Sequence, residues 1–115
     1  MTIVDDTTTW VDVCALEDLA VDRGACVLVD TYQVALFRPS PGDALYALSN
    51  YDPFSRAYVM SRGIVGTKGE VPKVASPVYK QAFDLRTGEC LDDPAVAVRT
   101  FPVRVVAGRV VVGRP

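Results

Sequence analysis

The chain has 115 residues, with 12 Lys and Arg against 14 Asp and Glu, and half of its residues are apolar. These values are typical of one globular domain, which we place over residues 10–115 behind a flexible N-terminal segment, 1–9. No apolar run approaches the roughly 18 residues of a membrane span, and no secretory signal opens the chain. We therefore expect a cytoplasmic protein that does not bind membranes. We also expect no binding to nucleic acid, because no basic run is interleaved with aromatic residues.

The chain contains no histidine, and its three cysteines (Cys14, Cys26 and Cys90) form no C-x-x-C pair. Catalytic Ser-His-Asp and Cys-His arrangements are therefore excluded, as are the usual zinc sites. We interpret the cysteines as reduced, structural thiols.

Short stretches rich in β-branched and aromatic residues follow one another along the chain, with turn residues between them. A helical turn or two is expected over 15–24, a loop over 39–43, and an irregular loop over 50–62 with a helical turn near 57–60. Turns are expected at 31–32, 68–70, 86–89 and 107–108. The strands are expected over 10–14, 25–30, 33–38, 44–49, 63–67, 71–75, 80–85, 101–106 and 109–112. This pattern predicts an all-β sandwich or small barrel of short antiparallel strands around one core.

Two motifs in this pattern resemble a known family. Residues 76–94 read SPVYKQAFDLRTGECLDDP, and residues 50–54 read NYDPF. The first is similar to the second half of a Rieske domain. Together, the two resemble the small subunit of bacterial NADH-dependent assimilatory nitrite reductase, and this resemblance extends from Trp10 to Val112. It implies a Rieske-like fold.

The resemblance also identifies four positions that hold cluster ligands in Rieske domains. Here these positions carry Asn50, Asp52, Ser76 and Tyr79 instead of two cysteines and two histidines. A Rieske [2Fe–2S] centre needs two thiolates and two imidazoles, so we expect no cluster, no metal and no catalytic residue in this chain. We hypothesise that the four side chains join the two loops by hydrogen bonds. The alternative is that they are exposed polar residues without mutual contact.

The function implied by the resemblance is that of a small, cluster-free accessory subunit. Its partner would be the nitrite reductase large subunit, which in that family carries siroheme, an iron–sulfur cluster and FAD and reduces nitrite to ammonium with NAD(P)H. The chain would then belong to an oxidoreductase without performing a redox step. Two alternatives remain open: an electron-transfer [2Fe–2S] protein with atypical ligands, and a stand-alone β-barrel binding module or small enzyme.

Charge is unevenly distributed along the chain. Residues 1–52 hold nine acids and two bases, whereas residues 53–115 hold five acids and ten bases. Exposed cations and aromatic residues can steer and anchor a protein partner. We therefore predict a partner-binding surface at the loop 50–62 and nearby residues, comprising Arg56, Arg62, Lys68, Lys73, Tyr79 and Lys80. The alternatives are that the asymmetry disappears in the folded chain, or that these residues serve solubility only.

Overall fold

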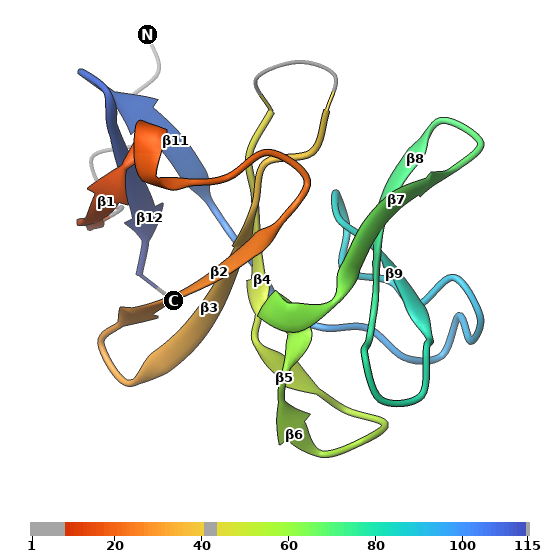
Figure 1. The fold of residues 1–115 in the computed structure, drawn as a ribbon. Coiled ribbons are helices and arrows are strands. Elements are labelled where there is room, and N and C mark those ends of the chain that lie inside the picture. Colours follow the sequence, from red (N-terminus) through yellow and green to blue (C-terminus); the bar gives the residue numbers. More distant parts are fainter. Residues whose placement is uncertain (1–8, 41–43, 115) are drawn as a thin grey trace, which may run out of the picture.

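A computed structural model describes residues 9–40 and 44–114. In these residues the chain forms antiparallel strands and two short 3₁₀ turns, η2 (Leu16–Asp18) and η3 (Met60–Arg62) (Figure 1). The expected all-β fold is confirmed. Residues 1–8 of the N-terminal segment and residues 41–43 of the loop expected over 39–43 lie outside the described residues. No helix in the described residues is long and apolar enough to cross a membrane.

Four sheets make up the described fold. Their strand orders are β1-β12-β11, β10-β4-β3-β2, β5-β6 and β7-β8-β9. The strands are β1 (Trp10–Ala15), β2 (Gly24–Val29), β3 (Tyr32–Phe37), β4 (Tyr46–Ser49), β5 (Tyr51–Asp52), β6 (Ala57–Tyr58), β7 (Ile64–Lys68), β8 (Val71–Ala75), β9 (Ala82–Asp84), β10 (Thr100–Phe101), β11 (Val103–Val106) and β12 (Arg109–Gly113).

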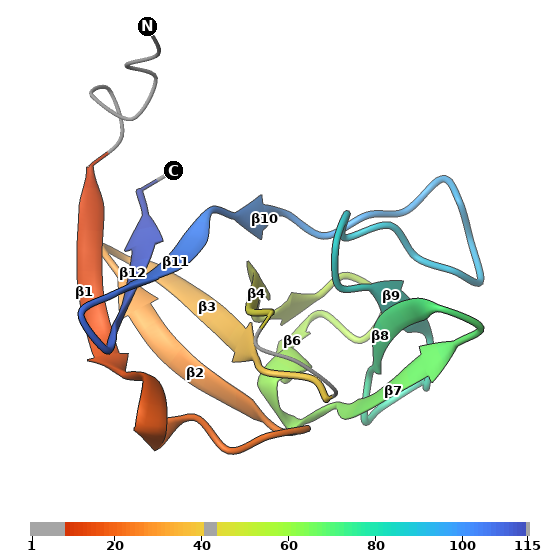
Figure 2. The same cartoon turned by 90° about the horizontal axis from the view of Figure 1, so that it is seen from above.

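The sheet containing β3 is the middle layer of the molecule. Figure 2 shows the β1-β12-β11 sheet on one side of it and the β7-β8-β9 sheet on the other. Since side chains alternate along a strand, Ala35 and Phe37 enter one hydrophobic cluster, whereas Val34 and Leu36 enter another. The interior is therefore divided into two clusters, instead of the single core expected from the sequence. Burial on both faces also explains why residues 34–37 form an unbroken apolar run.

Two of the hairpin turns depend on residues with positive φ. Ala107 and Gly108 join β11 to β12 with φ values of 50° and 76°, and both signs match a type I′ turn. The β2–β3 turn lies at Asp30 and Thr31, one residue earlier than expected, because Asp30 takes the left-handed conformation at φ 56°. Aspartate tolerates this conformation better than most residues.

The strand expected over 101–106 is divided at Pro102. Proline has no amide hydrogen to donate to a ladder, so it interrupts the pairing. Before it, β10 pairs with β4 of the middle sheet; after it, β11 pairs with β12 of the outer sheet. The chain thus passes from one layer to the next at this proline.

The segment 50–62 is more regular than the sequence predicts. The helical turn expected near 57–60 is wrong, because Ala57 and Tyr58 form β6, paired with β5, and the 3₁₀ turn comes later at η3. Two-residue strands are too short to show an alternating pattern. The resulting β5–β6 hairpin and the connection between β8 and β9 lie at the same end of the molecule (Figure 1).

Candidate functional site

The candidate site is formed by two five-residue loops at this end, the first loop (residues 52–56) and the second loop (residues 76–80). Each closes with a backbone hydrogen bond between its last amide and its first carbonyl: Arg56 to Asp52 at 2.7 Å, and Lys80 to Ser76 at 3.1 Å. The last residue has positive φ in both, 59° at Arg56 and 67° at Lys80. The two loops therefore share one backbone design.

The first side chain of each loop fixes that design. Asp52 Oδ1 accepts a hydrogen bond from the Phe54 amide at 2.9 Å, and Ser76 Oγ accepts one from the Val78 amide at 3.3 Å. Aspartate and serine commonly stabilise turns by bonding the amide two residues ahead. Proline follows in both loops, at Pro53 and Pro77.

The same design occurs a third time in residues 84–88, the third loop. Asp84 Oδ1 accepts from the Arg86 amide at 2.8 Å, and the Gly88 amide donates to the Asp84 carbonyl at 2.7 Å. Gly88 has φ of 81°. The side-chain hydrogen bond from Arg86 is the main reason that the pKa of Asp84 lies below its ordinary value. This loop begins at Asp84, the last residue of β9.

A direct hydrogen bond joins the first loop to the second. Ser76 Oγ donates to Asp52 Oδ2 at 2.5 Å, and Ser55 Oγ donates to the same oxygen at 2.8 Å. Asp52 has no exposed surface, and Ser76 is 1% exposed. A buried carboxylate is tolerated only when its oxygens are well hydrogen-bonded. The pair therefore closes the space between the loops.

Hydrogen-bond donors, rather than a positively charged neighbour, stabilise the negative charge of Asp52. Burial on its own raises the pKa of Asp52, but the hydrogen bonds from Ser76, Ser55 and the Phe54 amide outweigh it. The pKa is left below its ordinary value, so Asp52 is ionised at neutral pH.

Asn50 has a different task. Its Nδ2 donates to Gln33 Oε1 at 3.0 Å and to the Tyr58 carbonyl at 3.2 Å, and its Oδ1 accepts from the Ser61 amide at 2.7 Å. This side chain is 2% exposed. Asn50 therefore ties the start of β3 to β6 and η3, and it does not contact the second loop by a hydrogen bond.

Tyr79 does not join the network. Its side chain is 61% exposed, and among the described residues its phenol has no hydrogen-bond partner. The hypothesis that four side chains join the two loops is thus right for Asp52 and Ser76, and wrong for Tyr79 and for Asn50, whose hydrogen bonds go to Gln33, Tyr58 and Ser61. Sequence reasoning missed Gln33 and Ser55; Asp52 followed by Pro53 indicates a turn, but no sequence signal identifies these two partners.

The six residues predicted to bind a partner are distributed over separate parts of the structure. Arg56, Tyr79 and Lys80 lie in the two loops, and Arg62 ends η3. Lys73 lies within β8, opposite Gly66 of β7 and Asp84 of β9. Lys68 lies at the far end of the β7–β8 hairpin. Since β8 leads directly into Ser76, that turn is roughly 17 Å from the second loop at about 3.3 Å per residue. Figure 1 shows it pointing away from the loops.

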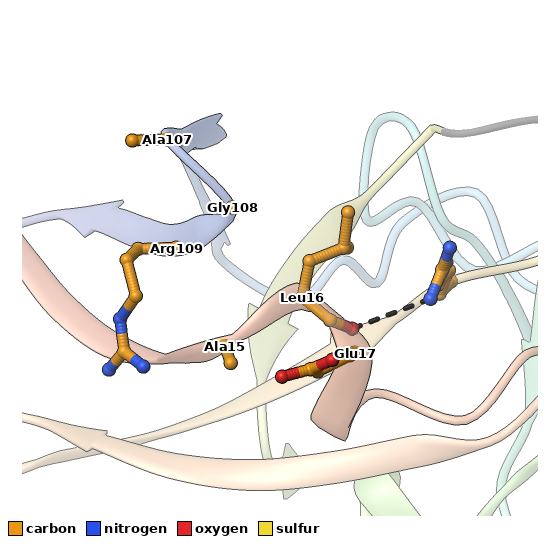
Figure 3. Close-up of a pocket in the computed structure, with 7 residues that line it drawn as sticks. Ala15, Leu16, Glu17, Ala107, Gly108 and Arg109 are labelled. Atoms are coloured by element: carbon orange, nitrogen blue, oxygen red, sulfur yellow. Dashed lines mark hydrogen bonds between the residues drawn. The ribbon is translucent and has the colours of Figure 1, made fainter.

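A hollow of about 560 Å³ lies away from both loops, between η2 and the β11–β12 turn (Figure 3). Its two cations are already engaged. Arg38 donates to the carbonyls of Leu16 and Leu19 at 3.4 and 3.3 Å, and Arg109 pairs with Asp12 at 2.8 Å. Besides these two cations the hollow is lined by the carboxylate of Glu17 and by small or apolar residues, and we do not assign a function to it.

The antiparallel layers and the paired loops define a Rieske-like domain, and comparison with known proteins agrees. Residues 9–113 match the family model described as Rieske-like [2Fe-2S] domain, so the chain belongs to this family. Within the family, it is 40% identical over 99 residues to the nitrite reductase (NADH) small subunit of Escherichia coli K12, covering 86% of this chain and 92% of that protein. The resemblance seen in the sequence is confirmed.

Two further relatives bear on the fold and the partner. A crystal structure of a candidate NADH-dependent nitrite reductase small subunit from Mycobacterium tuberculosis superposes with a TM-score of 0.90 and 49% identity, covering 96% of this chain and 98% of that one. The nitrite reductase [NAD(P)H] large subunit of Klebsiella oxytoca is 43% identical over 104 residues, which are 90% of this chain but 11% of that protein.

The residues that the motif resemblance aligns with the cluster ligands do not fit the cluster for which the family is named. A Rieske centre is held by two thiolates and two imidazoles. Here the donors are an amide, a carboxylate, a hydroxyl and a phenol, which are poorly matched to soft iron–sulfur chemistry. Three of them are already hydrogen-bonded within the protein, and the fourth is Tyr79 at the surface. Within residues 9–40 and 44–114, no group of three or more His, Cys, Asp or Glu is arranged to bind a metal.

Proposed function

We propose that this chain is the small, cluster-free accessory subunit of an NADH-dependent nitrite reductase, acting in the cytoplasm as one domain over residues 10–115. Its partner is the large subunit, which holds the siroheme, iron–sulfur cluster, FAD and NAD(P)H and reduces nitrite to ammonium. The chain stabilises or positions that subunit and performs no redox step of its own.

The observation that carries this proposal is the hydrogen bond between Asp52 and Ser76. It joins the two loops that, by the motif resemblance, carry the cluster ligands in Rieske domains, and both side chains are buried. A rigid, closed loop pair is suited to recognition of another surface, because little conformational freedom is lost on binding.

The large-subunit relative from Klebsiella oxytoca supports the choice of partner. A segment like this chain forms part of that longer polypeptide. Covalent connection keeps two domains at a high effective concentration, which is useful when the domains work together. A separate small subunit would need a docking surface instead.

The test is to purify the large subunit alone and together with this chain, and to measure nitrite-dependent NADH oxidation and association. We expect the two to co-purify, and the activity or stability of the large subunit to fall when the small subunit is omitted. Absence of both effects would refute the subunit role. The isolated chain should also be colourless and contain neither iron nor acid-labile sulfide; their presence in stoichiometric amounts would favour the electron-transfer alternative.

A further inference from the structure

Exposed aromatic side chains gather along the edge of the molecule that carries the two loops. Tyr32 begins β3 and is 44% exposed, Tyr58 lies in β6 at 57%, and Tyr79 lies in the second loop at 61%. Val78, beside Tyr79, is 46% exposed. Exposed tyrosines are common anchors of protein interfaces.

Internal hydrogen bonds keep these side chains on one continuous edge. Asn50 ties Gln33, next to Tyr32, to the carbonyl of Tyr58. The bond from Ser76 to Asp52 then connects the β5–β6 hairpin to the loop carrying Tyr79. In Figure 1 the β2–β3 turn, the β5–β6 hairpin and the β8–β9 connection follow one another along the lower edge.

The part of this edge formed by the two loops is positively charged, whereas the rest of the chain is acidic, and Asp30 at the β2–β3 turn is paired with Arg114 at 2.9 Å. Residues 50–62 and 76–81 contain Arg56, Arg62 and Lys80, and their one carboxylate, Asp52, is buried. The remainder of the chain carries nine bases against 13 acids. Arg99 lies 5.4 Å above the Tyr32 ring and adds a cation beside the edge. Such a patch attracts a surface of negative potential.

Two of these cations occupy positions that favour glycine. Arg56 and Lys80 have φ values of 59° and 67°, whereas the equivalent position of the third loop is Gly88. A residue with a side chain costs about 1–2 kcal/mol in this conformation. Strain that is retained in a protein commonly marks a functional position, and here it places both cations at the loop ends.

From these observations we infer that the docking edge, defined as Tyr32, Arg56, Tyr58, Val78, Tyr79 and Lys80, binds an acidic face of the nitrite reductase large subunit. Tyr58 and Tyr79 bury their rings at the centre, and Arg56 and Lys80 pair with carboxylates at the rim. This inference rests on the proposed function and names the surface that performs it. It leaves Lys68, at the distant hairpin turn, outside the interface.

The test measures the affinity of the separately purified large subunit for the full-length chain and its variants. Tyr79→Ser and Tyr58→Ser remove the central rings, and Lys80→Glu reverses a rim charge. Lys68→Glu is the matched control for charge reversal at a turn, and Val106→Ser is the control for loss of a half-exposed apolar side chain at the β11–β12 hairpin. Thermal unfolding of each variant checks that it is folded; Tyr79 has no described side-chain partner, so Tyr79→Ser is the most secure.

We expect Tyr79→Ser and Tyr58→Ser each to raise the dissociation constant about 10-fold or more. Lys80→Glu should weaken binding and make it less dependent on salt, whereas both controls should remain within about 2-fold of the wild type. If the wild-type chain does not bind the large subunit, the proposed function itself fails. If the wild type binds but Tyr79→Ser and Lys80→Glu bind as tightly as the wild type, the docking edge is wrong while the subunit role stands. The same conclusion follows if Lys68→Glu weakens binding as much as Lys80→Glu does.

Discussion

At the scale of single residues, Asp52 shows how a polar position becomes part of the interior. Its carboxylate receives three side-chain and amide hydrogen bonds from residues 54, 55 and 76, and no surface remains exposed. The sequence indicates that Asp52 and Ser76 are unsuited to an iron–sulfur cluster and leads to the hypothesis of hydrogen bonds among four loop residues, but it does not single out these two as the pair that bonds across the loops. That pairing depends on how two hairpins meet in space.

Removing the Ser76 hydroxyl should destabilise the fold. Ser76→Ala leaves a buried carboxylate oxygen with one donor fewer, and a hydrogen bond to a charged group contributes about 1.5–3 kcal/mol. Ser40→Ala is a suitable control, because the Ser40 hydroxyl donates to Asp22 at 2.6 Å on the exposed surface. Urea denaturation should show the predicted loss for Ser76→Ala and less than about 1 kcal/mol for Ser40→Ala. Equal losses would contradict the special role of the buried bond.

Stability should depend on pH through Asp52. Its pKa in the folded chain lies below the unfolded value of about 3.9, so its contribution is fully present above that pH and is lost as pH falls through the lowered value. In Asp52→Asn the titrating group is absent. Between pH 5 and pH 3, the free energy of unfolding should therefore fall less in Asp52→Asn than in the wild type; parallel curves would refute this assignment.

The strain at Lys80 predicts a gain in stability when the side chain is removed. Lys80→Gly removes the strain of positive φ, but glycine also makes the unfolded chain more flexible, which opposes folding. The net gain in the free energy of unfolding should be about 0.5–1 kcal/mol. Lys68→Gly should instead lose about 0.5–1 kcal/mol, since Lys68 lies in β7. Chemical denaturation compares the two. A loss of stability in Lys80→Gly would mean that the lysine is held there by contacts rather than retained at a cost.

At the scale of elements, the three loops share an architecture that their sequences only partly reveal. Each begins with Asp or Ser bonding the amide two residues ahead and ends with a residue of positive φ. The last position is predictable in the third loop, where Gly88 marks a turn, but Arg56 and Lys80 carry no such signal. The hairpin β7–β8 follows from turn residues and alternating patterns, whereas the two-residue strands β5 and β6 are too short to be recognised.

Replacing Gly88 in the third loop should destabilise the protein much more than replacing Gly69 in the β7–β8 turn. A Cβ at Gly88 would lie 2.1 Å from the Val98 carbonyl oxygen, whereas a Cβ at Gly69 would meet no atom within 4 Å, and both residues have positive φ. Gly69→Ala should therefore cost about 1–2 kcal/mol from backbone strain alone. Gly88→Ala should cost at least about 1–3 kcal/mol more, since backbone must move. Thermal unfolding of both variants measures the difference; similar midpoints would contradict the close approach of the two segments.

At the scale of the whole molecule, the middle sheet connects two hydrophobic clusters through β3 and β4. Leu48 enters one cluster and Ala47 the other, in the same way as the alternating residues of β3. The class of fold follows from many short strands separated by turns, and the family follows from the two loop motifs. The division of the interior could not be predicted, because an unbroken apolar run does not reveal how many layers cover it.

The closed loop pair also limits how this scaffold could regain a metal. A cysteine at position 76 would replace the hydroxyl that donates to Asp52 with a weak thiol donor, while the carboxylate stayed buried. A histidine at position 52 would leave the Ser55 and Ser76 hydroxyls to find new acceptors in an enclosed space. Each single substitution that introduces a metal ligand thus leaves a buried polar atom without a partner. Binding a metal at this site would therefore require residues of both loops to be replaced together.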